Sequence, residues 1–324
     1  MKSVVIPRYG GPEVLEVRNV PDPQPQPGEV MVRVEAGGVN FADLLTAKGE
    51  YPGTPPPPLV AGREFCGHRE DNGQRVMGYT QSQAFAERVA VRPEFIWPAP
   101  EKWTVEECAA FPVTFFTAYL AYWKAGLIDS HVGQPPSAVP RVLIHAVAGG
   151  VGTAAVQIGH LLGIETFGTS SSDEKLERVK AIGLTHGINY TRDDYVDKVR
   201  DLTGDEGVDA VFEMLGGEHV KKSVQCLAWL GRVITYGAAS GERAEFDPRM
   251  LYERQTSVHG LWLSKLSLHP EIMQPAWQRL SQWIAEDRLH PQVGHVLPME
   301  KSGDAYRLLS DRRNYGKVVL RIQT

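Results

Sequence analysis

The sequence predicts an α/β protein with two domains: a doubly wound parallel sheet in the middle of the chain, and a β-rich domain formed mainly by its first third. In Val142–Gly163, an apolar β-branched run is followed by a glycine-rich turn and a helical pattern. From there to Gly237, strand and helix patterns alternate, which requires crossover connections and therefore a parallel sheet. Met1–Phe111 instead shows short strand patterns with few helices.

The glycine-rich turn reads AGGVG and has the residues that a dinucleotide-binding turn requires. Gly149 and Gly150 let the backbone approach a pyrophosphate, and Gly152 lets the helix pack closely on the strand. The amides at the helix start, that of Val151 included, then face the negative charge. These four residues are predicted cofactor contacts. Val147 stands where G-x-G-x-x-G has its first glycine, so the turn is a variant, and an ordinary strand–helix connection is the alternative.

The end of the second strand indicates which dinucleotide binds. In NAD sites an Asp or Glu about 20 residues beyond the glycines accepts from the ribose 2′-OH. Ser171 occupies this position, next to Ser170, and Lys175 follows. Hydroxyls can donate to a 2′-phosphate and a lysine can pair with it, so the pattern favours NADPH. The serines could instead only cap the next helix, and Asp173 or Glu174 could turn inward.

Composition limits the class of protein. The chain has 324 residues, 42% hydrophobic and 23% charged, and a formal net charge of −5, as in ordinary globular proteins. This balance gives no electrostatic reason to expect nucleic acid or an anionic membrane as a partner. Cys66, Cys108 and Cys226 are far apart, which predicts buried free thiols rather than disulfides. No membrane-length apolar run or signal pattern occurs, so we expect a cytoplasmic protein.

The first domain is predicted from short apolar runs that end at Pro- or Gly-rich turns. Its strand patterns are Val4–Ile6, Leu15–Val20, Glu29–Val39 and Gln74–Val91. The main helix lies near Asn40–Lys48, and Pro52–Pro58 is predicted to be an extended surface loop. Thr104–Gly126 is helical with a break at Pro112 and leads into the central domain.

The central domain alternates strands and helices. The predicted strands are Ile164–Thr169, Gly187–Tyr190, Val208–Leu215 and Arg232–Gly237, and the predicted helices are Ser172–Ile182, Asp193–Leu202 and His219–Leu230. After Gly237 the chain is expected to return to the first domain through Glu253–Leu263 and a helix at Pro270–Asp287. Tyr315–Ile322 is predicted to be the last strand.

Seven motifs together resemble the medium-chain dehydrogenase/reductase superfamily, and within it the zinc-independent quinone oxidoreductase (zeta-crystallin-like) branch. They are GGVNFAD, GREFCG, GQRVMG, FPVTFFTAY, HAVAGGVG, GTSSSDEKLE and YGKVVL. The resemblance covers essentially the whole chain. It implies a Rossmann cofactor-binding domain at 119–255 and a β-rich GroES-like catalytic domain formed by 1–118 and 256–324.

The positions of the zinc ligands support the same branch. A catalytic zinc needs about three protein ligands from Cys, His or carboxylate. Zinc-dependent relatives have a Cys where this chain has Val39 or Asn40, and a His next to the Glu where it has Arg63 and Glu64. No metal is predicted.

The resemblance also implies catalytic residues in the first domain. Asn40 corresponds to an Asn beside the nicotinamide ribose or substrate carbonyl, although an N-cap role alone would also explain it. Tyr51 corresponds to the proton donor of related enoyl reductases, since its O–H can protonate a developing enolate. Its alternative role is a surface aromatic packed on the prolines.

Further cofactor contacts are implied at six positions. Thr117 corresponds to a Thr packed on the nicotinamide, and Tyr190 to a Tyr on the adenine side. Gly237 ends a strand at the carboxyl edge of the sheet, where ligands bind in such folds. The last implied contacts are Arg312, Asn314 and Lys317, for which surface salt bridges are the alternative.

Without a metal to polarise a carbonyl, hydride transfer needs an electron-poor acceptor. We therefore expect an NADPH-dependent quinone oxidoreductase. A reductase of enals, enones or enoyl thioesters, with Tyr51 as acid, is the second hypothesis, and GLWL at Gly260–Leu263 resembles a segment of such enzymes. A non-catalytic NADPH-binding or redox-sensing protein is the third. A homodimer is expected, paired through the edge strand Val258–Leu263.

Overall fold

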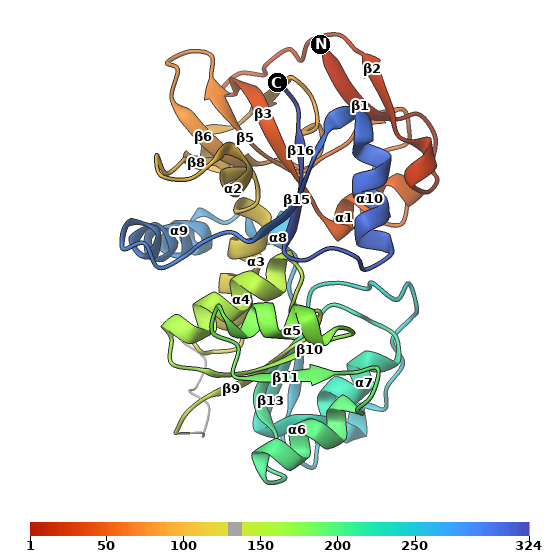
Figure 1. Ribbon diagram of the computed structural model, residues 1–324, viewed down its shortest axis with the longest axis vertical. Helices are drawn as coiled ribbons and strands as arrows, with labels where there is room; N and C mark the ends of the chain where they lie inside the picture. Colours follow the sequence, from red (N-terminus) through yellow and green to blue (C-terminus); the bar gives the residue numbers. More distant parts are fainter. Residues whose placement is uncertain (129–137, 324) are drawn as a thin grey trace. The chain divides into compact units, whose positions relative to one another are not determined.

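A computed structural model describes residues 1–128 and 138–323, which form two compact units (Figure 1). Unit 1 comprises Met1–Thr114 and His290–Thr324, and unit 2 comprises Phe115–Leu289. The helix α3 (Pro112–Lys124) contains the boundary between them.

Unit 2 is built on a six-stranded parallel sheet in the order β11-β10-β9-β12-β13-β14. The strands are β9 (Arg141–Ile144), β10 (Glu165–Ser170), β11 (His186–Asn189), β12 (Val208–Glu213), β13 (Leu227–Thr235) and β14 (Ser257–Gly260). Strand order reverses between β9 and β12, and ligands of doubly wound sheets bind at the carboxyl ends next to this point. The predicted Rossmann sheet is confirmed.

Helices cover both faces of this sheet. They are α4 (Gly150–Leu161), α5 (Asp173–Lys180), α6 (Tyr195–Thr203) and α7 (Glu218–Gln225). Unit 2 also contains η3 (Pro248–Leu251), α8 (Leu263–Leu266) and α9 (Pro270–Ala285). Figure 1 shows α4 and α5 on one side of the strands and α6 and α7 on the other. Buried apolar residues of the strands, such as Leu143, Phe167 and Val211, form the core with residues of α6 and α7.

The start of β13 differs from the prediction. The helix expected at His219–Leu230 ends at Gln225, and Leu227–Leu230 belong to the strand. Leu227 pairs with Val208 of β12, so sheet pairing overrides a run whose apolar residues also suit a helix.

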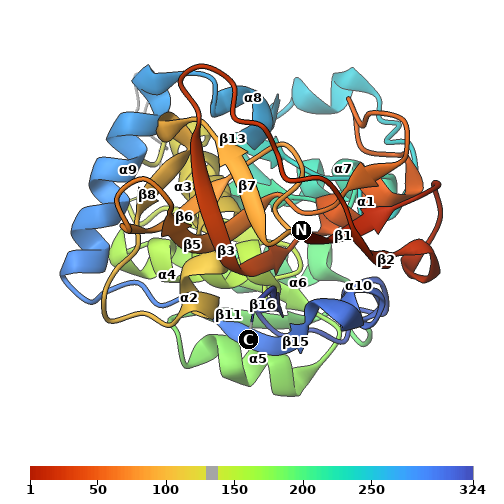
Figure 2. The same ribbon diagram turned by 90° about the horizontal axis from the view of Figure 1, so that it is seen from above.

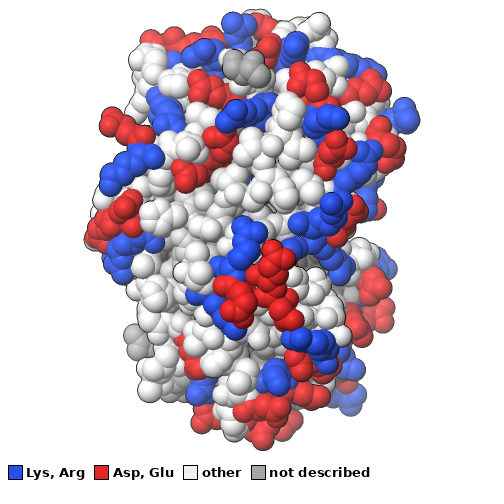
Figure 3. Space-filling view, in the orientation of Figure 1, with Lys and Arg blue, Asp and Glu red and all other residues white. Residues whose placement is uncertain are grey.

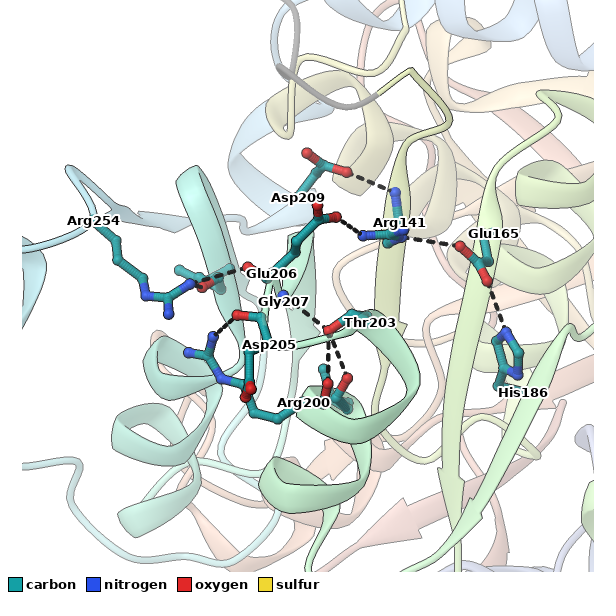
Figure 4. Close-up of polar contacts among 12 residues, drawn as sticks. Arg141, Glu165, His186, Arg200, Thr203, Asp205, Glu206, Gly207, Asp209 and Arg254 are labelled. Atoms are coloured by element: carbon teal, nitrogen blue, oxygen red, sulfur yellow. Dashed lines mark hydrogen bonds and ion pairs between the residues drawn. The ribbon is translucent and has the colours of Figure 1, made fainter.

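At the amino ends of the strands, Arg141 joins several segments of unit 2 (Figure 4). Its backbone N–H donates to Asp209 Oδ2 at 2.7 Å, and its guanidinium pairs with Glu165 at 3.1 Å and Glu206 at 2.6 Å. Glu165 also lies 2.8 Å from His186 Nε2. The network therefore links the amino ends of β9, β10, β11 and β12.

Unit 1 contains a seven-stranded and a three-stranded sheet. The larger runs β15-β16-β3-β5-β6-β8, with β7 paired to β3, and the smaller runs β2-β1-β4. The bounds are β1 (Lys2–Ile6), β2 (Glu16–Asn19), β3 (Val30–Val39), β4 (Leu59–Val60), β5 (Glu64–Arg69), β6 (Arg75–Tyr79), β7 (Arg88–Val91), β8 (Ile96–Pro98), β15 (Val293–Pro298) and β16 (Lys317–Arg321). Figure 2 shows β3 and β7 side by side. The predicted β-rich domain is confirmed.

The helices of unit 1 are few and short. They are η1 (Pro12–Val14), α1 (Phe41–Lys48), η2 (Pro93–Phe95), α2 (Val105–Ala109), η4 (Met299–Lys301) and α10 (Ser302–Ser310). Asn40 caps α1, where its backbone N–H donates to Asp43 Oδ2 at 2.8 Å, and Gly49 ends the helix in the left-handed region. Acidic and basic side chains are interspersed over the face of the molecule that Figure 3 shows.

One predicted domain boundary needs correction. Residues 256–289, which the sequence assigned to the first domain, lie in unit 2. The physical reason is β14, which pairs in parallel with β13 from Ser257 to Gly260 and extends the Rossmann sheet by one strand. The return to unit 1 therefore comes at His290.

Candidate active site and cofactor site

The glycine-rich turn leaves the start of α4 open to a ligand. Gly149 is the N-cap, with extended backbone and no side chain to accept from the helix amides. The first amides of a helix need such partners, and an anion can supply them. A Cβ on Gly152 would lie 2.4 Å from the Val147 carbonyl oxygen, so only glycine allows this helix to approach the turn. The turn therefore has the backbone of a pyrophosphate site.

Val147, the departure from the glycine pattern, is accommodated by the neighbouring strand. A Cβ on Gly168 of β10 would lie 2.6 Å from Val147 Cγ2, so the missing side chain of Gly168 makes room for the valine. The Val147 amide donates to the Thr169 carbonyl at 3.1 Å. The turn thus has a valine where the pattern has a glycine, and the strand has a glycine opposite it, so the turn and the strand still pack closely.

The end of β10 brings several predicted cofactor contacts together. Ser170 is buried and Ser171 exposed, and Tyr190, whose N–H donates to the Ser170 carbonyl at 3.1 Å, is 38% exposed at the end of β11. Lys175 lies in the first turn of α5. Burial lowers the pKa of its ammonium, an effect that Glu174 opposes. Hydroxyls and a cation thus lie at the edge where the ribose of a dinucleotide is expected.

Asp173 could in principle turn toward the ribose, as the carboxylate of an NAD site does, but it bonds to other residues of the protein. Its Oδ1 accepts from Asn189 Nδ2 at 3.0 Å and from Arg192 at 2.8 Å. Sequence reasoning missed Arg192, which adds a second cation here. Its position two residues after Tyr190 was the available signal.

The remaining predicted contacts of unit 2 lie farther along the chain. Thr117 is buried on α3. Gly237 follows β13, and a Cβ there would lie 2.8 Å from the Met214 carbonyl oxygen. Gly237 also lines a cavity of about 340 Å³ beside the ends of β13 and β14.

In unit 1, Asn40 and Lys317 meet at a buried carboxylate. The Lys317 ammonium pairs with Glu64 and donates to Asn40 Oδ1, and Asn40 Nδ2 donates to Glu64 Oε1 at 2.8 Å. The other oxygen of Glu64 accepts from the Val113 amide at 2.7 Å, at the start of α3. All three side chains are less than a tenth exposed. This cluster joins β3, β5, β16 and the entry to α3.

These contacts restrict what Asn40 can do. Its Nδ2 also donates to the Gly38 carbonyl at 3.2 Å, so both amide hydrogens are used within the protein. An amide group has two hydrogens to donate, and Oδ1 keeps one lone pair beyond the bond from Lys317. In this arrangement Asn40 can accept a further hydrogen bond but cannot donate one to a substrate carbonyl.

Tyr51 lies against a second buried ion pair. The Arg63 guanidinium stands 3.9 Å from the centroid of the Tyr51 ring, donates to Thr46 Oγ1 at 2.8 Å and lies 3.6 Å from Asp43 Oδ1. Burial raises the pKa of Asp43 to about 6, although Arg63 and Lys317 oppose the shift. No sequence pattern singled out Arg63 beyond its place beside Glu64.

Arg312 and Asn314 lie in the loop between α10 and β16. Arg312 is exposed with φ +56°, and Asn314 Nδ2 donates to the Gly316 carbonyl at 3.1 Å. Within residues 1–128 and 138–323, no group of three or more His, Cys, Asp and Glu is placed to hold a metal ion. Over the same residues, no helix combines the length and apolar character needed to cross a bilayer.

Two family models match the chain. The alcohol dehydrogenase GroES-like domain matches residues 26–101, and the zinc-binding dehydrogenase family matches residues 150–286. The two matches fall in unit 1 and unit 2 respectively.

Individual relatives are similar over nearly the whole chain. The human synaptic vesicle membrane protein VAT-1 homolog is 31% identical, over 99% of this chain and 86% of that protein. Mouse quinone oxidoreductase-like protein 2 is 30% identical, over 92% and 86%. The structure of a quinone oxidoreductase from Thermus thermophilus, solved also in complex with NADPH, is 37% identical with a TM-score of 0.88, over 99% and 100%. On this basis the chain belongs to the medium-chain dehydrogenase/reductase oxidoreductases, in the zinc-independent quinone oxidoreductase branch.

Proposed function

We propose that this protein uses NADPH to reduce an electron-poor acceptor, with quinones as the first candidate. The observation that carries the cofactor assignment is the end of β10, where Ser171 and Lys175 lie and where Asp173 is turned to Asn189 and Arg192. A 2′-phosphate would meet hydroxyls and cations there, whereas a ribose 2′-OH would lack its usual carboxylate partner.

NADPH, when bound, supplies the hydride. The open amides at the start of α4 bind its pyrophosphate, and the close approach that Gly152 allows keeps the helix end next to the strand. Lys175, with Arg192 nearby, pairs with the 2′-phosphate. Gly237, Thr117 and the unit 1 residues Arg312, Asn314 and Lys317 remain predicted contacts.

The proposed acceptor is a quinone, because reduction of a quinone can leave a phenolate that solvent protonates. No positioned acid is then required. Two relatives with quinone oxidoreductase in their names support this class of acceptor.

A second candidate, reduction of an enone or enoyl thioester, is favoured by the surroundings of Tyr51. Its reaction leaves an enolate carbon that must be protonated, and Tyr51 is the proposed donor. The Arg63 guanidinium over the Tyr51 ring would stabilise the negative charge that the tyrosine gains on giving up its proton.

A steady-state comparison tests the proposal. NADPH and NADH oxidation would be followed with neutral quinones, enals and enoyl thioesters. We expect turnover with NADPH and quinones at the highest kcat/KM. Equal use of both cofactors would contradict the cofactor assignment, and NADPH binding without turnover of any acceptor would favour a non-catalytic role.

A further inference from the structure

The cavity beside Gly237 is lined by residues that, apart from Gly237 itself, have no role in the proposed cofactor site. It measures about 340 Å³ and is lined by residues of α3, β13, β14 and α8, all in unit 2. These residues are Lys124, Thr235, Tyr236, Gly237, Gly260, Leu261, Trp262, Lys265 and Leu266. Because the strands are parallel, their carboxyl ends share one edge, and the cavity therefore lies on the ligand-binding side of the sheet.

The charged residues that line this cavity are all positive. Lys124 and Lys265 both line the cavity, and the lining includes no Asp or Glu. Neither lysine forms an ion pair with a carboxylate among the described residues of the chain. Lys124 also acts on His259 of β14, whose pKa is lowered by burial and then by Arg232 and Lys124. The positive charge therefore extends over this part of the sheet.

Glu213 bonds to Thr235 of the lining, and its carboxylate is fully engaged. Glu213 is fully buried, and its Oε1 accepts from the amides of Leu215 at 2.6 Å and Gly216 at 2.9 Å. Its Oε2 accepts from Thr235 Oγ1 at 3.3 Å, and burial raises the pKa of its carboxyl group. Both oxygens of Glu213 therefore already accept hydrogen bonds within unit 2.

The other large cavity of unit 2 provides a contrast. It measures about 500 Å³, and its cationic residues Arg200, Lys222 and Arg254 are matched by Asp194, Asp197 and Glu253. Figure 4 shows that Arg200 and Arg254 also donate to backbone carbonyls. Its charges balance within the protein, whereas those of the cavity at Gly237 do not.

The rest of the lining suits a flat unsaturated body. Trp262, Leu261 and Leu266 supply apolar surface, and the Lys265 ammonium lies 5.4 Å from the centroid of a Trp262 ring. An aromatic face next to a cation can stack a conjugated system while the cation pairs with its charged substituent.

We propose that this cavity binds the acceptor through an anionic group, and that Lys124 and Lys265 give the enzyme a preference for acceptors bearing a carboxylate or sulfonate on a planar conjugated body. The inference rests on the proposed reductase function and adds to it the charge class of the acceptor.

Two matched acceptors test this preference: 1,4-naphthoquinone-2-sulfonate and neutral 1,4-naphthoquinone. Lys124→Gln and Lys265→Gln should each raise KM for the sulfonate about fivefold, because an ion pair at a partly exposed site contributes up to about 1 kcal/mol. KM for the neutral quinone should stay within about twofold. Lys221→Gln, on α7 and outside the cavity, is the control and should change neither value. Equal effects on both quinones, or no effect on the sulfonate, would overturn the proposal.

A binding experiment separates this proposal from the reductase function itself. Calorimetry with naphthalene-2-sulfonate, which cannot be reduced, should show tighter binding to the unmodified protein than to the double variant Lys124→Gln/Lys265→Gln. The neutral 2-naphthol should bind both proteins equally. Loss of this difference overturns the anion site even if quinones are reduced, and its presence supports the site even if neither quinone is turned over.

Discussion

At the scale of single residues, Tyr51 and Arg63 have the most specific arrangement in unit 1. The guanidinium is buried, bonded to Thr46 and close to Asp43, so it holds one face of the Tyr51 ring in a fixed environment. A guanidinium over an aromatic ring is attracted to the face of the ring and so restrains its orientation. Tyr51 is therefore the residue that we propose as proton donor to an enolate, whether or not quinones are also substrates.

Replacing Tyr51 with Phe keeps the ring and removes only the proton. We expect a small loss of kcat with quinones and a loss of about 10²–10⁴-fold with enones or enoyl thioesters, the usual contribution of a positioned acid. Steady-state kinetics with both acceptor classes measures the difference. Tyr9→Phe, a partly exposed tyrosine of the same unit, is the control. A large defect with quinones would mean that the tyrosine also acts in their reduction.

Lys175→Ala tests the cofactor site. The variant should weaken NADPH binding by about 1.5–3 kcal/mol, the range for hydrogen bonds to charged groups, and leave NADH binding nearly unchanged. Fluorescence titration of both cofactors gives the two dissociation constants. Lys180→Ala, whose ammonium pairs with Glu177 on the surface, is the matched control. Parallel losses for both cofactors would place Lys175 away from the 2′-phosphate.

At the scale of elements, Glu64 connects β5 to the start of α3. Its carboxylate accepts from the Val113 amide and pairs with Lys317, so a negative charge lies at a helix N-terminus and opposite a buried cation. Neither charge has water to solvate it, since both side chains are less than a twentieth exposed. Each of these buried charges is therefore stable only while the other is present.

Glu64→Gln should therefore destabilise the protein by about 3–5 kcal/mol, because it leaves Lys317 buried without its counter-ion. The double variant Glu64→Gln/Lys317→Met should recover much of this loss. Denaturant unfolding of the two single variants and the double variant completes the cycle. Additive effects of the two substitutions would show that the ion pair is not what stabilises this region.

The elements also show how far sequence reasoning reached. The glycine turn, the alternating strands and the break before α3 were predictable because each depends on residues close together in the chain. The cluster of Asn40, Glu64 and Lys317 was not, since the contact from Lys317 to Asn40 joins residues 277 positions apart. Family resemblance named Asn40 and Lys317 separately, and only the fold shows that they bond to each other.

Arg192 was missed, and the strand expected at Val258–Leu263, observed as β14 (Ser257–Gly260), was not placed in unit 2, for related reasons. A surface arginine has no local pattern, and its pairing with Asp173 depends on how β11 lies beside β10. The strand β14 is short, and its assignment to unit 2 depends on parallel pairing with β13. The structure shows where each predicted site residue lies within its own unit. Their roles toward a cofactor remain predictions.

At the scale of the whole molecule, acid should destabilise the fold through His145. This buried histidine lies 3.1 Å from Thr169 Oγ1 and 3.2 Å from Ser223 Oγ, and burial lowers its pKa to about 3. The unfolded chain, with a histidine pKa near 6.5, binds the proton first. Stability from this group is therefore complete above about pH 6.5 and is lost as the pH falls toward 3. Asp43, with its raised pKa, acts in the opposite direction between about pH 6 and 4.

His145→Gln removes the titration and isolates it from that of Asp43. Between pH 7 and 5, the unmodified protein should lose about 2 kcal/mol more unfolding free energy than the variant. Denaturant unfolding at several pH values measures both slopes, with His269→Gln at an exposed position as control. Equal slopes for the variant and the unmodified protein would rule out His145 as the source.

Assembly is the second prediction at this scale. Within the described residues β14 ends the parallel sheet, so its outer edge has backbone groups for a second copy to pair with. We expect a homodimer by sedimentation at micromolar concentration, and Val258→Lys on β14 should shift it toward monomer. Val296→Lys on β15, an edge strand of the larger sheet of unit 1, should not. A monomeric unmodified protein would contradict the prediction.

The Arg141 network has a consequence for changing this enzyme by design. It holds four strands together at the amino edge of the sheet, while every proposed cofactor contact of unit 2 from Gly149 to Gly237 lies toward the other edge. Loops after β10 and β11 can thus be exchanged without touching the residues that fix strand order. The cofactor preference of this protein should be convertible by substitutions at Ser171, Lys175 and Arg192, with the sheet serving as an unchanged scaffold.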